Sequence, residues 1–273
     1  MARSISALRL VHPFPSVVNS ALVLGLALLA GADAARATLL AGAMLGIQFC
    51  IGTVNDLFDE RLDRVAKPWK PIAAGIVSRR AAWTIALFAG GGALLFAAVP
   101  GRATLAMAAA MLACGLVYDA RLKRTTWAWL CFSVAFVILP VYAWYGAAGQ
   151  LPPRPEFLLP LAALAGPVIQ LSNGLADLER DAAAGLPTLA TRLGRRSSLL
   201  LIALLLAVIH GLAWLTLTAA TAAALGSVAL ATLLALLGLG LSTSPRPSWR
   251  EIGWMVQACA IALLGLGWVS AVS

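Results

Sequence analysis

Charged residues are scarce in this chain. Only 11% of its 273 residues are Asp, Glu, Lys or Arg, whereas soluble globular domains carry roughly a quarter. The four cysteines lie in separate apolar stretches, and none belongs to a CxxC pair. Their positions therefore indicate small buried hydrophobic residues. With 61% hydrophobic residues, the composition excludes an ordinary soluble domain and predicts a membrane protein.

The sequence contains several long runs of apolar residues. A helix needs about 20 apolar residues to cross a bilayer. The run 197–241 is too long for one crossing at about 1.5 Å per residue, so we divide it near 216–221. The sequence predicts an all-α polytopic protein, with residues 1–273 forming one integral-membrane domain. The nine predicted spans are 14–32, 37–55, 81–100, 103–119, 127–149, 156–176, 197–217, 220–241 and 252–272.

Positive charge is unevenly divided between the predicted loops. The formal net charge of +9 would indicate nucleic acid as a partner of a soluble protein. With nine spans, however, all but three of the 20 Lys and Arg residues fall on the side of the N-terminus; the exceptions are Arg36, Arg102 and Arg154. Such an excess marks the cytoplasmic side. We therefore expect a cell-membrane protein surrounded by lipids, without nucleic acid, with its N-terminus and charged loops cytoplasmic and its C-terminus outside.

Carboxylates are rare, yet they gather at the ends of two spans. Asp56, Asp59 and Asp63 follow the second span at spacings of three and four residues, so a helix places them on one face. Three like charges repel one another unless a cation lies between them. Mg²⁺ takes one or two carboxylates and completes its shell with phosphate oxygens and water. The spacing therefore favours a site for a divalent ion with a phosphate-bearing ligand.

A second acidic group follows the sixth span. Asn173, Asp177 and Asp181 recur every four residues, again on one helical face. A single juxtamembrane carboxylate is unremarkable, but solvated faces favour mixed charge, so two such faces at the same membrane side indicate one function. Basic residues follow that would balance phosphate charge. Those nearest the two groups are Lys67, Lys70, Lys123 and Arg124.

Two polar residues lie within the first spans. Asn19 is in the first and Gln48 is in the second, seven residues before Asn55 and on roughly the same helical face. An interhelical hydrogen bond and a contact with substrate both fit a lone amide in a span. The sequence leaves these two interpretations open.

The acidic motifs resemble those of the UbiA-type intramembrane prenyltransferases. The NDxxDxxxD pattern of that family matches residues 55–63, and its DxxxD pattern matches residues 177–181. The basic turn that follows the first pattern in many members matches residues 67–72. A Tyr-to-Lys element on the fourth helix resembles residues 118–123, although the spacing is one residue longer than in some branches.

This resemblance implies nine helices around a central cavity, with the acidic motifs facing each other across its cytoplasmic mouth. It implies Mg²⁺-dependent transfer of a prenyl group from a prenyl diphosphate to an aromatic or lipid acceptor, with release of pyrophosphate. We assign Mg²⁺ ligation to Asp56, Asp59, Asp177 and Asp181, catalysis to these four with Asp63, Lys67 and Lys123, and substrate binding to Asn19, Gln48, Asn55, Lys70, Tyr118, Arg124 and Asn173.

Other reactions fit the same resemblance, and one alternative lies outside it. Related branches transfer phosphoribose to polyprenyl phosphate or cyclise terpenoid diphosphates without an acceptor. A cation-coupled transporter would use the acids as an ion relay. Against transport, these acids lie at the ends of the spans instead of at the midplane. The sequence does not identify the acceptor.

Overall fold

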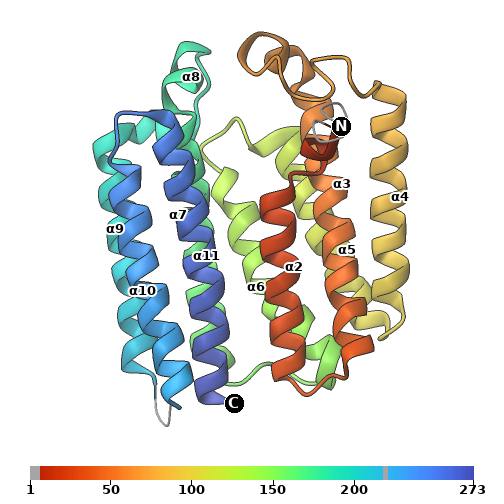
Figure 1. Ribbon diagram of the computed structural model, residues 1–273, viewed down its shortest axis with the longest axis vertical. Helices are drawn as coiled ribbons and strands as arrows, with labels where there is room; N and C mark the ends of the chain where they lie inside the picture. The colour runs from red at the N-terminus through yellow and green to blue at the C-terminus, as the bar shows by residue number, and fades with distance from the viewer. Residues whose placement is uncertain (1–6, 218–220) are drawn as a thin grey trace.

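The computed structural model describes residues 7–217 and 221–273, and within these ranges it contains helices and no strand. Figure 1 shows the long helices side by side in a bundle. They are α2 (Pro13–Leu29), α3 (Ala34–Ala66), α4 (Arg79–Ala98), α5 (Arg102–Val117), α6 (Ala128–Ala148), α7 (Pro155–Ala176), α9 (Leu189–Leu215), α10 (Ala222–Ser242) and α11 (Pro247–Val272). Three short elements lie near one end: η1 (Arg9–Val11), η2 (Tyr118–Leu122) and α8 (Leu178–Ala183).

The all-α polytopic prediction is confirmed. Eight of the helices have the length and hydropathy of membrane spans, and α2, with 17 residues, is a shorter apolar helix. Each predicted span overlaps one of these helices. The long apolar run is indeed two helices, since α9 ends at Leu215 and α10 begins at Ala222. Residues 218–220 of the predicted division, and the predicted cytoplasmic N-terminus at 1–6, lie outside the described residues.

The helix α3 carries the first acidic motif beyond the apolar layer. It begins where the Asp33 carboxylate accepts a hydrogen bond of 2.8 Å from the Arg36 backbone N–H, a typical N-cap. It ends before Pro68, which disfavours a helical conformation at the preceding residue. Its 33 residues make it about 50 Å long, whereas the hydrocarbon core is roughly 30 Å thick. Its last turns therefore reach the membrane surface.

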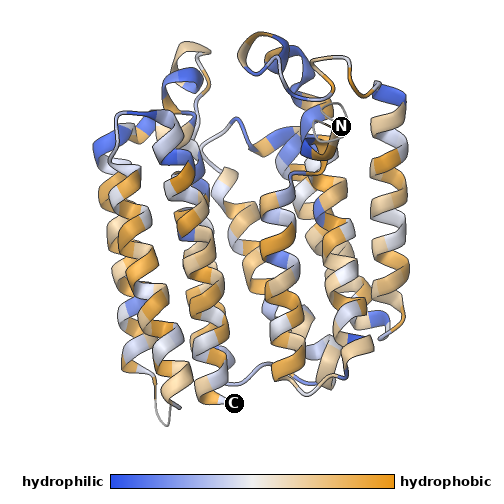
Figure 2. Cartoon of the chain, in the orientation of Figure 1, coloured by the Kyte–Doolittle hydropathy of each residue, from blue (hydrophilic) through white to orange (hydrophobic). Residues whose placement is uncertain are grey.

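Six helices enclose the centre of the bundle. In order around it, α2, α3, α5, α6, α7 and α11 each pack against the next, and α11 packs against α2. The helices α4 and α10 pack on the outside of this ring, against α3 and α11. Figure 2 shows that the long helices are mainly hydrophobic along their lengths and that hydrophilic residues collect at the end that carries η1 and α8. Both acidic motifs lie at this end.

A glycine brings α7 close to α6. A Cβ on Gly166 would lie only 2.4 Å from the backbone nitrogen of Ser133, so a larger residue would push the two helices apart. The Ser133 hydroxyl also donates a hydrogen bond of 2.8 Å to the Ala163 carbonyl. Small residues at such crossings let membrane helices approach closely. This contact fixes α7, whose next turns carry Gln170 and Asn173 toward the centre.

Candidate functional site

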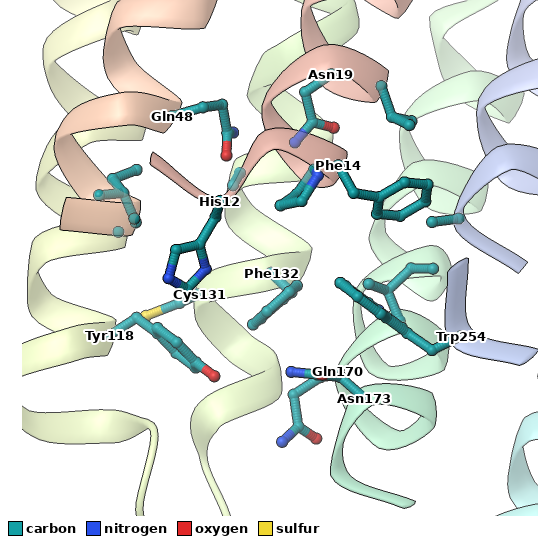
Figure 3. Close-up of a pocket in the computed structure, with 18 of the residues that line it drawn as sticks. His12, Phe14, Asn19, Gln48, Tyr118, Cys131, Phe132, Gln170, Asn173 and Trp254 are labelled. Atoms are coloured by element: carbon teal, nitrogen blue, oxygen red, sulfur yellow. The ribbon is translucent and has the colours of Figure 1, made fainter. Parts of the chain in front are cut away.

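The centre of the bundle contains a cavity of about 920 Å³. It extends from the acidic motifs into an apolar region lined by side chains such as Leu22, Ile47 and Leu161. Every site residue predicted from the sequence lines this one cavity: Asn19, Gln48, Asn55, Asp56, Asp59, Asp63, Lys67, Lys70, Tyr118, Lys123, Arg124, Asn173, Asp177 and Asp181. Figure 3 shows part of the lining, with polar side chains from several helices directed into the same space.

The first acidic motif is engaged by a lysine from the loop that follows it. Lys70 Nζ lies 2.8 Å from Asp56 Oδ1 and 2.8 Å from Asp63 Oδ2. Burial opposes the charge on Lys70, but the two carboxylates outweigh that effect and raise its pKa. The second oxygen of Asp56 is buried and has no hydrogen-bond partner among the described residues. One face of α3 therefore presents a carboxylate oxygen that no described residue satisfies.

Asp59 is paired with the basic residues that follow α5. Lys123 Nζ lies 2.8 Å from Asp59 Oδ2, and Arg124 Nη2 lies 2.8 Å from Asp59 Oδ1. The element η2 is one turn of π-helix, closed by a hydrogen bond of 2.9 Å from the Lys123 N–H to the Tyr118 carbonyl. A π turn accommodates one more residue than an α turn and is frequent at functional sites. The extra residue in this turn accommodates the longer spacing from Tyr118 to Lys123, and both side chains line the cavity.

The second acidic motif faces the first across the cavity. Lys67, which follows α3, reaches over to it, with its Nζ 3.1 Å from Asp177 Oδ2. Arg180 contacts the other oxygen of Asp177. Burial and the neighbouring charge of Asp177 raise the pKa of Asp181 to about 6. A carboxylate pair that repels itself in this way is stabilised when a cation binds between its members.

A buried arginine orients this motif. The Asp181 N–H donates to the Asp177 carbonyl at 2.9 Å, so these residues are one helical turn apart, and Glu179 points to the opposite side. Glu179 contacts Arg250, whose side chain is 0% exposed and also donates to the Pro245 carbonyl at 3.1 Å. None of the six residues of α8, all of them described, is buried. The anchor to α11 thus turns the aspartates toward the cavity.

Loss of this anchor should weaken substrate binding more than it weakens folding. We expect Arg250→Gln and Glu179→Gln each to raise the KM for the prenyl diphosphate predicted from the sequence about tenfold, because α8 has little packing to hold the second acidic motif in place. Steady-state kinetics and the melting temperature would be measured together. The exposed Arg246→Gln in the same segment is the matched control. An unchanged KM in both variants would contradict the anchoring role.

His12 also lines the cavity, although its position in the sequence does not mark it as a site residue. Its Nε2 lies 2.9 Å from Asp56 Oδ1, and its backbone is left-handed with φ of 48°, a conformation found where surrounding structure demands it. Gly52 makes room for the imidazole, since a Cβ there would lie 3.1 Å from His12 Cβ. The Ser16 hydroxyl donates a hydrogen bond of 2.9 Å to the His12 carbonyl. These contacts direct the ring at the first acidic motif.

Two more buried polar residues line the cavity and were not among the site residues predicted from the sequence. Asp119 is 3% exposed, and its Oδ1 accepts a hydrogen bond of 2.8 Å from Asn55 Nδ2. Asn55 therefore holds a carboxylate in place. Gln170 is 5% exposed and lines the cavity from α7. Neither stands out in the sequence, because a single polar residue in a span is as compatible with helix packing as with a site.

The donor set fits Mg²⁺. Within residues 7–217 and 221–273, no three His, Cys, Asp or Glu side chains form a ready-made metal cage. Mg²⁺ does not require one, because it is usually bound through one or two carboxylates and substrate phosphates. The Asp56 oxygen that has no described partner is a carboxylate group that could bind such an ion. Asp177 and Asp181, whose negative charges repel each other, are two more. Asp59 lies on the same face of α3 and is the fourth carboxylate of the predicted set.

Known proteins share this architecture. An apo UbiA homolog from Aeropyrum pernix K1 superposes with a TM-score of 0.76 at 19% identity, over 92% of this chain and 96% of that one. A UbiA homolog from Archaeoglobus fulgidus bound to GPP and Mg²⁺ gives a TM-score of 0.72 at 22% identity, over 97% and 99%. At these identities the similarity shows the fold.

Sequence comparisons identify the family. A digeranylgeranylglyceryl phosphate synthase from Methanothrix thermoacetophila is 33% identical over 164 residues, which are 59% of this chain and 60% of that relative. The chain thus matches about three fifths of the length of that relative. The model of the UbiA prenyltransferase family matches residues 17–252. Since that match covers most of the sequence and both acidic motifs, the chain belongs to the UbiA prenyltransferase family.

Proposed function

We propose that this protein transfers a prenyl group from a prenyl diphosphate to an aromatic or lipid acceptor within the membrane, with Mg²⁺ as cofactor. The observation that carries the proposal is the pairing of two acidic faces, on α3 and α8, across the mouth of one cavity whose deeper wall is apolar. The fold neighbour from A. fulgidus that was solved with GPP and Mg²⁺ supports the same pairing of ligand and metal here.

The mouth of the cavity is built to hold a diphosphate. Mg²⁺ held by Asp56, Asp59, Asp177 and Asp181 would act as a Lewis acid that neutralises the diphosphate charge. Four basic side chains lie next to the place where the phosphate oxygens would bind. Each has a nitrogen 2.8–3.1 Å from an oxygen of one of these carboxylates: Lys67, Lys70, Lys123 and Arg124. As the allylic C–O bond breaks, the leaving pyrophosphate gains negative charge, and preorganised cations stabilise that change.

The cavity below the mouth protects the allylic cation. The Tyr118 ring lines it and stacks edge-to-face on Phe132, with ring centroids 5.2 Å apart, and both rings are seen in Figure 3. The face of an aromatic ring attracts a cation. The apolar side chains that line the deeper cavity provide a place for the prenyl tail and keep water from quenching the cation.

The orientation in the membrane follows from the loop charges. We infer that the mouth of the cavity faces the cytoplasm, because nearly all of the described Lys and Arg residues lie in the segments at its end of the bundle. A cation-coupled transporter receives no support. Its ion relay would lie near the midplane, whereas these acids lie at one end of the bundle.

The test is acceptor-dependent release of pyrophosphate. Purified protein in lipid nanodiscs would receive geranylgeranyl diphosphate and Mg²⁺ with a panel of aromatic and glycerol-lipid acceptors, and the products would be identified by mass spectrometry. We expect release only with an acceptor, together with a prenylated product. Release without any acceptor would indicate cyclisation instead. No release with any prenyl diphosphate would overturn the proposal and direct attention to phosphoribosyl transfer.

A further inference from the structure

The cavity extends along most of the length of the bundle. Its lining residues follow α7 from Leu158 to the C-cap Asp177, and α11 from Pro247 to Val269. At about 1.5 Å per residue, each of these stretches is roughly 30 Å long. Figure 1 shows the end of α11 far from α8. The closed end of the cavity, opposite to the acidic motifs, therefore lies between the first turns of α7 and the last turns of α11.

A buried tryptophan lines this end of the cavity. Tryptophan is enriched where spans meet the membrane interface, and Trp214 near the end of α9 is 40% exposed. Trp268 also lies near the end of its helix, but it is 2% exposed and faces the cavity together with Leu161 and Ile209. Its ring is therefore part of the inner wall and not an anchor in the membrane interface.

Neighbouring helices hold the Trp268 ring in place. Its Nε1–H donates a hydrogen bond of 2.8 Å to Oγ1 of Thr216, the C-cap residue of α9. The Thr216 carbonyl in turn accepts a hydrogen bond of 3.0 Å from Arg154 Nη1. The backbone next to the ring is also fixed, because a Cβ on Gly267 would lie 2.8 Å from Ser227 Cβ on α10. Protein interiors are close-packed, so a ring held in this way does not move aside without cost.

A contact between α7 and α11 gives the depth of this ring below the mouth. The two helices run in opposite directions (Figure 1), and Ser172 on α7 contacts Gln257 on α11. Asp177 lies five residues from Ser172 toward the mouth. Trp268 lies eleven residues from Gln257 in the opposite direction. Along the bundle, Trp268 is therefore about 24 Å below the level of Asp177.

This depth matches a prenyl tail of four isoprene units. An extended chain advances about 1.2 Å per bond, so each isoprene unit, with four bonds along the chain, adds about 5 Å. Four units span roughly 20 Å. With the diphosphate at the mouth, such a tail fills the distance to Trp268. A fifth unit would meet the indole ring.

We propose that Trp268 sets the upper limit on the length of the prenyl tail, so that the protein accepts a geranylgeranyl diphosphate and discriminates against tails with further isoprene units. This inference rests on the proposed prenyl transfer. The indole N–H is bonded to Thr216, so the tail meets only the apolar part of the ring. Trp268 takes no part in the chemical step, because it lies at the far end of the cavity from the diphosphate.

The test is the binding of unreactive prenyl thiolodiphosphates of increasing length. The farnesyl, geranylgeranyl, geranylfarnesyl and hexaprenyl analogues would be titrated with Mg²⁺ into protein in lipid nanodiscs and followed by calorimetry. The proteins are wild type, Trp268→Ala and Trp268→Leu, of which the leucine variant keeps part of the packing. Trp249→Ala is the matched control, because Trp249 lies on the same helix and is 43% exposed. Melting temperatures would be recorded for all four proteins.

We expect wild type and Trp249→Ala to bind the geranylgeranyl analogue at least about tenfold more tightly than the two longer analogues. Both Trp268 variants should reduce this preference to about twofold or less. A variant that weakens all lengths equally, or wild-type binding of the hexaprenyl analogue as tight as that of geranylgeranyl, would overturn the inference.

The binding assay needs no turnover, so the two proposals can fail separately. Length-limited binding that depends on Trp268, without prenyl transfer to any acceptor, would overturn the proposed function and leave the length limit standing. Prenyl transfer with a length preference that is the same in wild type and in both Trp268 variants would overturn the length limit alone. A wild-type protein that binds none of the analogues would overturn both.

Discussion

Replacing Asp56 by Asn should reduce the proposed prenyl transfer on the order of 100- to 1,000-fold while the protein still folds. The carboxylate carries the buried oxygen that lacks a partner among the described residues, and it lies at the mouth of the cavity instead of packing a core. Asp177→Asn should behave in the same way on the opposite side. Both variants would be assayed for product formation and for melting temperature in the same nanodiscs.

Glu60→Gln is the matched control for this experiment. Glu60 belongs to the same stretch of α3, but it pairs with Arg64 at 2.7 Å and with Arg79. Its loss removes an equal charge from the same helix without touching the cavity lining. We expect its turnover to stay within about twofold of wild type. Turnover like that of wild type in both aspartate variants would contradict the assignment of the acidic motifs to catalysis.

Removal of Mg²⁺ should stop the reaction and also weaken the binding of prenyl diphosphate. A diphosphate brought to this mouth without metal meets the negative charges of five aspartates on α3 and in the second motif. Metal binding removes that repulsion and leaves Lys67, Lys70, Lys123 and Arg124 available to the phosphate oxygens. Metal and diphosphate therefore stabilise each other, and by linkage each should raise the affinity of the other by the same factor.

The measurement is a calorimetric titration of geranylgeranyl diphosphate with and without Mg²⁺, followed by turnover after EDTA and after excess Mg²⁺. We expect binding to weaken at least about tenfold without metal, and activity to disappear with EDTA and return with Mg²⁺. Titration of Mg²⁺ into the Asp56→Asn protein provides the comparison. Turnover that persists in EDTA would contradict the role given to the metal.

The membrane architecture was predictable because it depends on local properties. A helix rises about 1.5 Å per residue, so the length of an apolar run limits how often it can cross the bilayer. This reasoning divided the run 197–241 correctly into α9 and α10. The acidic faces could be predicted equally well, because spacings of three and four residues place side chains on one face of any helix.

The identity of the residues that meet across the cavity depended on the tertiary structure. His12 and Asp56 are 44 positions apart, and Asn55 and Asp119 are 64 apart. Their contacts arise from the way α2, α3 and α5 pack, which no local spacing encodes. The anchor between Glu179 and Arg250 bridges 71 positions and is hidden in the sequence for the same reason.

The sequence by itself determined that this chain is a bundle of apolar helices with two acidic motifs at one membrane face, because periodicity and run length are properties of single helices. Only the tertiary structure decided that all the predicted site residues line one cavity and that His12 and Gln170 join them. It also decided that a π turn brings Lys123 to Asp59. These facts depend on the relative positions of different helices, which close packing at residues such as Gly52 and Gly166 sets.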